Sequence, residues 1–338
     1  MDGAGLIRRL SSGPARVCGL VAGGLGLVVA LTAAVPPSGA QHGAAPHNRS
    51  TALGNFLTSV SAVSASDAWA VGNAPGLALH WNGTRWVRTA IPHSSSLSAL
   101  NGVSALSASD AWAVGALGDV STTTLALHWN GTAWARVPTP SPGRFTDLTS
   151  VSAASPADAW AVGVNPALAL RWNGVAWTQV AVPHPPGSSL LGVSTLSPTD
   201  AWAVGNHVAN HTARTLVLLW NGTAWAQVAS PSPGRSPLND SLSGVSVLSA
   251  SDAWAVGASG RGHTPFSPQK TLVLHWNGTR WTQVPAPSPR GTGTSPFTVL
   301  TGVSARSPSD AWAVGCACTN DFDTTLVLHW NGTAWARS

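Results

Sequence analysis

Three histidines provide the first candidate chemistry. His207 and His211 lie four residues apart, and His263 follows in a later stretch between predicted strands. Three imidazoles could hold a transition metal such as zinc. Loop spacing does not fix the geometry of such ligands, and no sequence motif ties His263 to the other two. We therefore assign neither a metal site nor a cofactor to this sequence.

A short polar run near the C-terminus provides a second candidate. Asn320, Asp321 and Asp323 offer the oxygen ligands that calcium prefers. The run lacks the remaining positions of a complete calcium loop. We therefore treat Asp321 and Asp323 as candidate ligand-binding residues and not as metal ligands.

Two cysteines stand one residue apart. Cys316 and Cys318 point to the same side of an extended chain. In an oxidising compartment, such a pair can close a small disulfide or cross-link two chains, and we favour these fates over a redox or metal role.

Missing residue types exclude several enzyme classes. The sequence contains no Glu and no Tyr, so a paired-carboxylate hydrolase would depend on Asp alone. Sialidase chemistry, which uses a Tyr nucleophile, and galactose oxidase chemistry, which uses a Tyr radical, are also excluded. We find no Gly-rich phosphate loop, Ser-His-Asp order or nucleophile elbow, and we assign no catalytic residue.

The first forty residues have the pattern of a secretory signal peptide. Arginines at 8, 9 and 16 precede an apolar stretch from Val17 to Val35, and Ser38-Gly39-Ala40 matches a cleavage site. We expect cleavage near Ala40, followed by a linker over residues 41–56. An uncleaved signal anchor is the alternative, since nineteen apolar residues nearly span a bilayer. The cleaved form predicts a secreted or cell-surface protein with no membrane span in the mature chain.

The charge pattern argues against a nucleic-acid partner. Removing residues 1–40 takes three Arg and one Asp from 17 basic and 12 acidic residues, which leaves 14 and 11. No basic run or basic-aromatic stripe remains to neutralise a row of phosphates.

A tryptophan-marked repeat dominates the rest of the chain. Asp-Ala-Trp-Ala-Val-Gly occurs six times and is followed each time by Trp-Asn-Gly and then by a third Trp. These copies account for all eighteen tryptophans. A fixed period of this length is typical of solenoids and propellers.

Each repeat predicts four short antiparallel strands. In the second copy they cover Leu100–Leu106, Ala111–Gly115, Leu125–Trp129 and Thr132–Val137. Asn130-Gly131 predicts a two-residue type I′ turn, which would pair Leu127 with Trp134.

Side-chain alternation predicts how the sheets stack. We expect each sheet to have a bulky face with its tryptophans and a small face with its alanines, so that one sheet's bulky face packs on the next sheet's small face. We interpret the tryptophans as core residues and not as a row of sugar-stacking platforms.

Six such sheets predict an all-β fold. A β-propeller of six four-stranded blades over residues 57–338, closed into a ring, is our first expectation, and a β-solenoid of stacked hairpin sheets is the alternative. The sixth copy ends at Ser338, so its outer strand is predicted to be about three residues shorter than the others.

The repeat resembles those of secreted β-propeller proteins of the kelch and Asp-box kind, and especially the Trp-Asn-Gly-Thr-x-Trp repeat proteins of actinobacteria. The resemblance covers residues 57–337. Gly131 to Trp134 matches the end of an Asp-box, but Trp129 stands where that motif has Asp. The resemblance therefore implies the fold alone.

Specificity is expected on one face of the propeller. The connections between strands 2 and 3 of each blade, and between strand 4 and the next strand 1, lie on the same side and vary in length and sequence, up to a predicted loop over Ala258–Thr271. Their Asp147 and Asp240 add acidic groups. The charged and imidazole side chains that we select as the candidate ligand-binding face are Asp119, Arg144, His207, His211, Arg214, Arg235, Arg261, His263, Lys270, Arg290, Asp321 and Asp323.

These features favour a non-enzymatic binding or scaffold protein outside the cell. Its expected partner is an extracellular protein or a cell-wall carbohydrate. Two alternatives stay open: a glycan hydrolase or lyase that uses loop Asp and His residues, and a purely structural envelope protein.

Overall fold

The structure of the protein is a computed structural model that describes residues 56–73, 76–92, 98–118, 121–183, 187–209, 212–234, 239–260, 269–289, 297–318 and 323–338. The side chains of Ala209, Cys318 and Asp323 are outside this description. The predicted signal peptide and most of the linker also lie outside it. No helix in the described ranges is long and apolar enough to cross a membrane.

In the described ranges, twenty-four strands form six consecutive four-stranded antiparallel units, which we call blades 1 to 6. Blade 1 consists of β1 (Phe56–Ser64), β2 (Asp67–Asn73), β3 (Leu77–Trp81) and β4 (Trp86–Arg88). Blade 2 consists of β5 (Ser98–Ser107), β6 (Asp110–Leu117), β7 (Thr123–Trp129) and β8 (Trp134–Val137). Blade 3 consists of β9 (Asp147–Ser155), β10 (Asp158–Val164), β11 (Leu168–Trp172) and β12 (Trp177–Val180).

The other three blades repeat this order. Blade 4 consists of β13 (Ser188–Ser197), β14 (Asp200–Ala209), β15 (Thr212–Trp220) and β16 (Trp225–Gln227). Blade 5 consists of β17 (Ser241–Ser249), β18 (Asp252–Gly260), β19 (Gln269–Trp276) and β20 (Trp281–Gln283). Blade 6 consists of β21 (Phe297–Ser307), β22 (Asp310–Cys318), β23 (Asp323–Trp330) and β24 (Trp335–Arg337).

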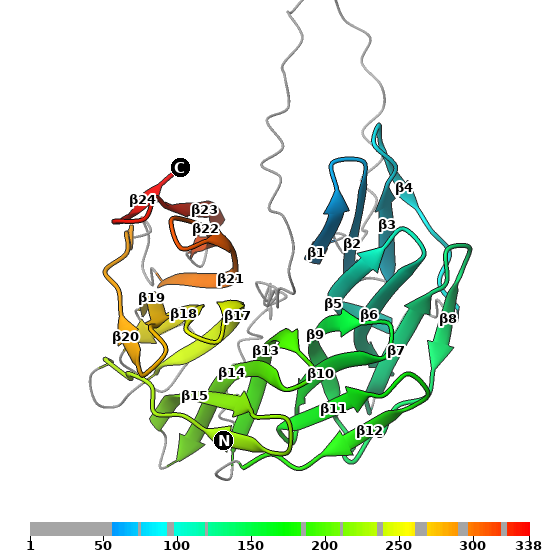
Figure 1. Cartoon of the computed structure of the whole chain (residues 1–338), viewed down its shortest axis with the longest axis horizontal. Coiled ribbons are helices and arrows are strands. Elements are labelled where there is room, and N and C mark those ends of the chain that lie inside the picture. The colour runs from blue at the N-terminus through cyan, green and yellow to red at the C-terminus, as the bar shows by residue number, and fades with distance from the viewer. Residues whose placement is uncertain are drawn as a thin grey trace, which may run out of the picture.

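The blades follow one another around an arc (Figure 1). The first strand of each blade packs against the first strand of the next, from β1 with β5 through to β17 with β21. A single bridge between Asn73 and Ala99 joins the sheets of blades 1 and 2. This order confirms the prediction of a propeller with six four-stranded blades.

The arc is open. Blades 1 and 6 stand apart in Figure 1, and in the described part of the chain β21 does not pack on β1 as it does on β17. The outer strand β24 is not shorter than β4, β16 or β20, since all four have three residues. The predicted shortening of the last strand is therefore wrong, and it does not explain the opening.

The loop between strands 3 and 4 of each blade differs from its prediction. In blade 2 it contains four residues, because Trp129 pairs directly with Trp134 and Leu127 pairs with Arg136. The side-chain oxygen of Asn130 accepts hydrogen bonds of 3.0 Å from the backbone N–H groups of the second and third residues after it. These bonds stabilise the longer loop, so the predicted two-residue turn and the predicted pairing are both wrong.

The register between the second and third strands decides which of their side chains share a face. Because Trp129 is opposite Ala111, Trp112 is opposite His128 and points to the other side of the sheet. The predicted division into one bulky and one small face is therefore wrong. Each blade has a front face, towards the next blade, and a back face, towards the previous one, and both carry tryptophan.

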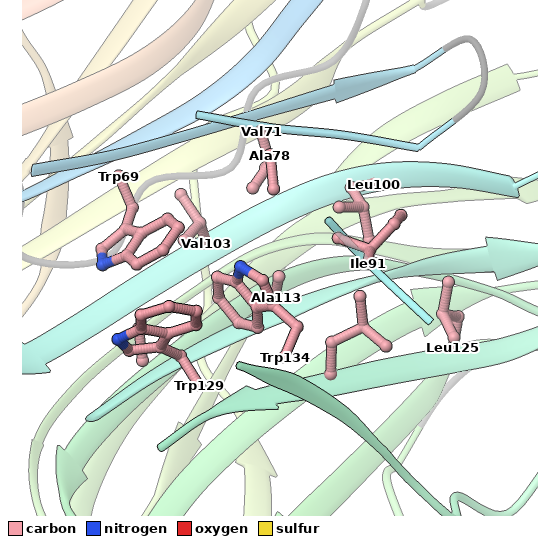
Figure 2. Close-up of a cluster of buried hydrophobic side chains, with 12 residues drawn as sticks. Trp69, Val71, Ala78, Ile91, Leu100, Val103, Ala113, Leu125, Trp129 and Trp134 are labelled. Carbon is pink, nitrogen blue, oxygen red and sulfur yellow. The ribbon is translucent and has the colours of Figure 1, made fainter. Parts of the chain in front are cut away.

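Each interface follows one pattern. The front face of blade 1 contributes Trp69 and Val71, and the back face of blade 2 surrounds them with Leu100, Val103 and a pair of tryptophans, Trp129 and Trp134 (Figure 2). The corresponding residues of the later blades form the same cluster at each of the next four interfaces. The indoles of these clusters are largely buried, which confirms their interpretation as core residues.

Hydrogen bonds between first strands accompany this apolar contact. The side-chain hydroxyl of Ser104 in blade 2 accepts a 3.1 Å bond from the N–H of Ala153 in blade 3. Equivalent bonds occur at the four remaining interfaces between consecutive blades, at Ser61–Ala105, Ser152–Thr195, Ser194–Val247 and Ser246–Ala305. The first strands therefore fix the position of each blade on its neighbour.

Candidate functional site

A histidine-aspartate pair recurs beside the first turn of four blades. In blade 2, Nε2 of His128 lies 2.9 Å from Oδ1 of Asp110, and the imidazole packs on Trp112 with ring centroids 4.5 Å apart. The same arrangement joins His80 to Asp67, His275 to Asp252 and His329 to Asp310.

The other two blades replace this histidine. In blade 3, Arg171 pairs with Asp158 at 2.9 Å and lies over the rings of Trp160 and Trp220. In blade 4, Leu219 takes the position, and Oδ1 of Asp200 is buried without a hydrogen-bond partner. Burial raises the pKa of Asp200. Because each of the five pairs lies within its own blade and against a tryptophan, the pairs are separate packing contacts and do not converge on one reaction centre.

The predicted ligand-binding face is only partly within the described residues. Arg144, Arg214 and Lys270 are exposed there, and His207 is half-buried. The other predicted residues lie outside the described residues or side chains, namely Asp119, His211, Arg235, Arg261, His263, Arg290, Asp321 and Asp323.

Several connections on this face are hairpin extensions instead of long loops. His207 pairs with Arg214 across β14 and β15, and Ser259 pairs with Lys270 across β18 and β19. The predicted loop over Ala258–Thr271 therefore begins and ends too far into the strands. Strand pairing places Arg214 and Lys270 on ordered ribbons that project from blades 4 and 5.

His207 is positioned poorly for metal binding. Its Nδ1 is buried without a hydrogen-bond partner, and both this burial and the charge of Arg214 lower the pKa of His207. The positive charge of the Arg214 guanidinium would also repel a metal cation bound to this imidazole. Among the described residues, no group of three or more His, Cys, Asp or Glu side chains has the arrangement of a metal site.

Asp240 has a structural role that the sequence did not reveal. Its side chain is fully buried and accepts bonds from the N–H of Gly234 at 2.9 Å and the N–H of Gly260 at 3.2 Å. The backbone N–H of Asp240 also donates to the carbonyl of Ala213. The carboxylate therefore ties the connection between blades 4 and 5 to the β18 end of the hairpin in blade 5.

Two exposed apolar side chains lie near the candidate cations. Phe145 follows Arg144 and is 53% exposed, and Val208 follows His207 and is 44% exposed. Neither residue is among the ligand-binding residues predicted from the sequence. An aromatic residue in a polar connection was the available signal for Phe145, while Val208 carries no comparable signal.

The structure tests the cysteine prediction for one of its two residues. Cys316 is disulfide-bonded. The side chain of Cys318 lies outside the described side chains, so the Cys316–Cys318 pairing stays a prediction.

Comparisons with known proteins support the architecture. No protein-family model matches the sequence, and no curated protein matches it. Among solved structures, YCF48 bound to a D1 peptide is 16% identical, with a TM-score of 0.52 over 84% of this chain and 80% of that one. A GH74 xyloglucanase from Xanthomonas campestris is 15% identical, with a TM-score of 0.57 over 84% of this chain and 45% of that one.

A third neighbour is also carbohydrate-active. A polysaccharide lyase that acts on ulvan is 8% identical, with a TM-score of 0.53 over 82% of this chain and 81% of that one. Identities this low establish shared fold and not shared activity. The chain is therefore a β-propeller of tryptophan-rich, four-stranded blades.

Proposed function

We propose that the protein is an exported, non-enzymatic binding propeller that recognises an extracellular protein or a cell-wall carbohydrate through the connections between strands 2 and 3 and between successive blades. The observation that carries the proposal is that exposed cationic side chains lie on one side of a repetitive scaffold, with Arg144 in the connection before β9 and Arg214 and Lys270 on the hairpin ends of blades 4 and 5. Variable side chains on a rigid framework are a common arrangement for binding.

The distribution of titratable groups also favours binding over catalysis. His128 and its counterparts are each held by an Asp of the same blade, and Asp240 is used internally. Their hydrogen bonds serve the scaffold. The three exposed cations and Phe145 instead suit a partner with acidic groups and an apolar surface, such as an acidic glycan or a peptide.

The proposed location rests on two features. Residues 1–40 have the signal-peptide pattern, and the Cys316 disulfide suits an oxidising compartment. The peptide-bound and carbohydrate-active neighbours make either partner class reasonable for this fold.

A matched pair of variants tests the assignment of the face. One variant carries Arg144→Ala, Phe145→Ala, Arg214→Ala and Lys270→Ala. The control carries Arg85→Ala and Arg280→Ala in exposed loops between strands 3 and 4, on the opposite side. Both are used as bait with envelope extract and on an immobilised polysaccharide panel. We expect the first variant alone to lose its ligand while both keep the wild-type thermal transition.

The enzymatic alternative is tested on the same panel. The xyloglucanase and ulvan lyase neighbours justify assays for polysaccharide hydrolysis and elimination. Reproducible turnover by the mature chain would replace the binding proposal, and equal retention of ligand by both variants would move the site to another face.

A further inference from the structure

Tryptophans meet in threes at every interface between consecutive blades. Trp69 of blade 1 lies with its centroid 4.8 Å from those of both Trp129 and Trp134 of blade 2. The same grouping recurs at four later interfaces, as Trp112–Trp172–Trp177, Trp160–Trp220–Trp225, Trp202–Trp276–Trp281 and Trp254–Trp330–Trp335. Three tryptophans remain: Trp312 on blade 6, and Trp81 with Trp86 on blade 1. They lie on the two sides of the gap between blades 6 and 1, and together they have the composition of a sixth three-tryptophan group that is not assembled.

The back face of blade 1 is uncovered. Leu57 is 55% exposed and Val60 is 41% exposed, whereas their counterparts in blade 2, Leu100 and Val103, are fully buried. Trp86 is only half-buried, while Trp134, its counterpart, is buried. Blade 1 therefore exposes its apolar back face, whereas the back face of each later blade is covered by the preceding blade.

The front face of blade 6 is uncovered in the complementary way. Trp312, Val314 and Val327 are half-buried, although the matching Trp254 and Val256 of blade 5 are buried. Asp310, beside the first turn, is also 36% exposed at its side chain. The gap is thus bordered by one front face and one back face, the two halves of the interface that the chain forms five times.

The existing interfaces resist closure of this gap. The first strands of adjacent blades approach so closely that a Cβ on Gly102 would lie 3.1 Å from the backbone of blade 3, and a Cβ on Gly244 would lie 3.1 Å from the backbone of blade 6. Together with the tryptophan clusters and the serine bonds, these contacts fix the rotation between blades. Bringing Trp312 against Trp86 would require several interfaces to change together.

We propose that the gap is a docking site for a seventh four-stranded blade of the same repeat type, supplied by a partner polypeptide. The occupant would present leucine, valine and two tryptophans to Trp312 and Val327, and a tryptophan with valine to Leu57 and Val60. The continuity of both gap faces with the five internal interfaces carries this proposal.

A whole second copy is a poorer occupant. Its first blade could match the front face of blade 6, but that blade continues into its own blade 2. Repeating the same rotation would place the second copy's blade 2 where blade 1 of the first copy already stands. A single blade with two free faces avoids this overlap.

The first experiment asks whether the gap accepts a blade. Residues 284–338 are duplicated directly after Arg337, which preserves the repeat period, and Val60→Cys reports exposure of the back face of blade 1. We expect rapid maleimide labelling at residue 60 in the six-blade chain. The added blade should slow that labelling at least tenfold and raise the midpoint of thermal unfolding. Peptide mapping separates the label at residue 60 from any label at the native cysteines.

Controls make each result decisive. Val103→Cys, at the internal counterpart of Val60, should resist labelling in both chains. Replacing the added copy's counterpart of Trp312 with Asp should abolish the protection of residue 60. Protection of residue 60 in the six-blade chain would show that the ring closes on itself, and no change on adding the blade would show that the gap cannot hold one. Either result overturns the proposal.

The second experiment tests supply by another polypeptide. A soluble carrier fused to residues 284–338 serves as the probe and is titrated into the full Val60→Cys chain. Saturable protection of residue 60 is expected, and it should be lost when Val327→Lys is added to the full chain. Absence of protection at saturating probe, in the presence of protection by the duplicated blade, would overturn docking from a partner.

Discussion

Trp254 of blade 5 lies edge-on to Trp335 of blade 6, with ring centroids 5.2 Å apart and ring planes at 87°. Neither indole N–H has a hydrogen-bond partner, although both are buried. In the first interface, by contrast, Trp134 donates to the hydroxyl of Thr89. The counterparts of Trp134 at the other later interfaces, Trp177, Trp225 and Trp281, also lack a partner, so aromatic geometry and apolar burial hold these indoles in place.

This packing predicts different costs for equivalent tryptophans. Trp202→Ala, inside the interface of blades 4 and 5, is expected to lower the free energy of unfolding by about 3–5 kcal/mol because it leaves a large buried cavity. Trp312→Ala, beside the gap, should cost less than half as much. Chemical denaturation of the two variants measures the difference, and equal losses would indicate that Trp312 is as well covered as Trp202.

The serine bonds between first strands predict a second difference. Ser104→Ala removes the acceptor of the Ala153 N–H and is expected to cost about 1–3 kcal/mol, since a backbone donor is left unpaired. Ser107→Ala is the control, since the Ser107 hydroxyl accepts a longer bond of 3.3 Å from the N–H of Ser109, which lies in an exposed turn where water can replace the lost acceptor. Its effect should stay within about 0.5 kcal/mol in the same denaturation experiment. A Ser104→Ala variant as stable as the control would argue against the bonded strand contact.

The repeat made the number and order of the blades predictable. Alternation in segments such as Asp110–Leu117 is a local signal, and it marks a strand whichever side finally faces the core. The pairing register is less visible. Asn130-Gly131 is compatible with a two-residue turn, but the side-chain bonds of Asn130 favour a longer loop, and this choice sets Trp134 opposite Trp129. The separate register between the second and third strands places Trp112 and Trp129 on different faces, and no residue in the sequence marks that register.

The candidate site was less predictable because it depends on contacts between distant segments. Asp240 and Arg144 both read as polar residues of connections, yet Asp240 is buried between two glycines and Arg144 is exposed. Similarly, no local pattern distinguishes Val60 at the gap from Val103 inside an interface. Only the curvature set by all the interfaces separates them.

Substitutions of Asp240 and Arg144 should therefore have different effects, the first on stability and the second on binding. Asp240→Ala is expected to lower the free energy of unfolding by about 2 kcal/mol, because two backbone N–H groups lose a buried acceptor. Arg144→Ala should leave stability within about 0.5 kcal/mol of wild type and weaken ligand capture. Thermal unfolding and a pull-down of each variant check both outcomes. Full ligand capture by Arg144→Ala would remove this residue from the proposed face.

The missing histidine of blade 4 predicts a dependence of stability on pH. Because burial raises the pKa of Asp200, the folded state binds its proton more tightly than the unfolded state. This group therefore reduces stability as the pH rises through the interval between the two pKa values. Asp200→Asn should be more stable than wild type at pH 7, by at most about 1 kcal/mol for a partly exposed group.

The gain from Asp200→Asn should shrink as the pH falls and wild-type Asp200 becomes protonated. Asp110→Asn is the matched control, since Asp110 has the His128 partner that Asp200 lacks. That substitution weakens an existing pair and should be destabilising at pH 7. Urea denaturation of both variants from pH 4 to pH 8 tests the difference. Equal destabilisation by the two substitutions at pH 7 would mean that Asp200 has a stabilising partner after all, and the two carboxylates would then have the same structural role.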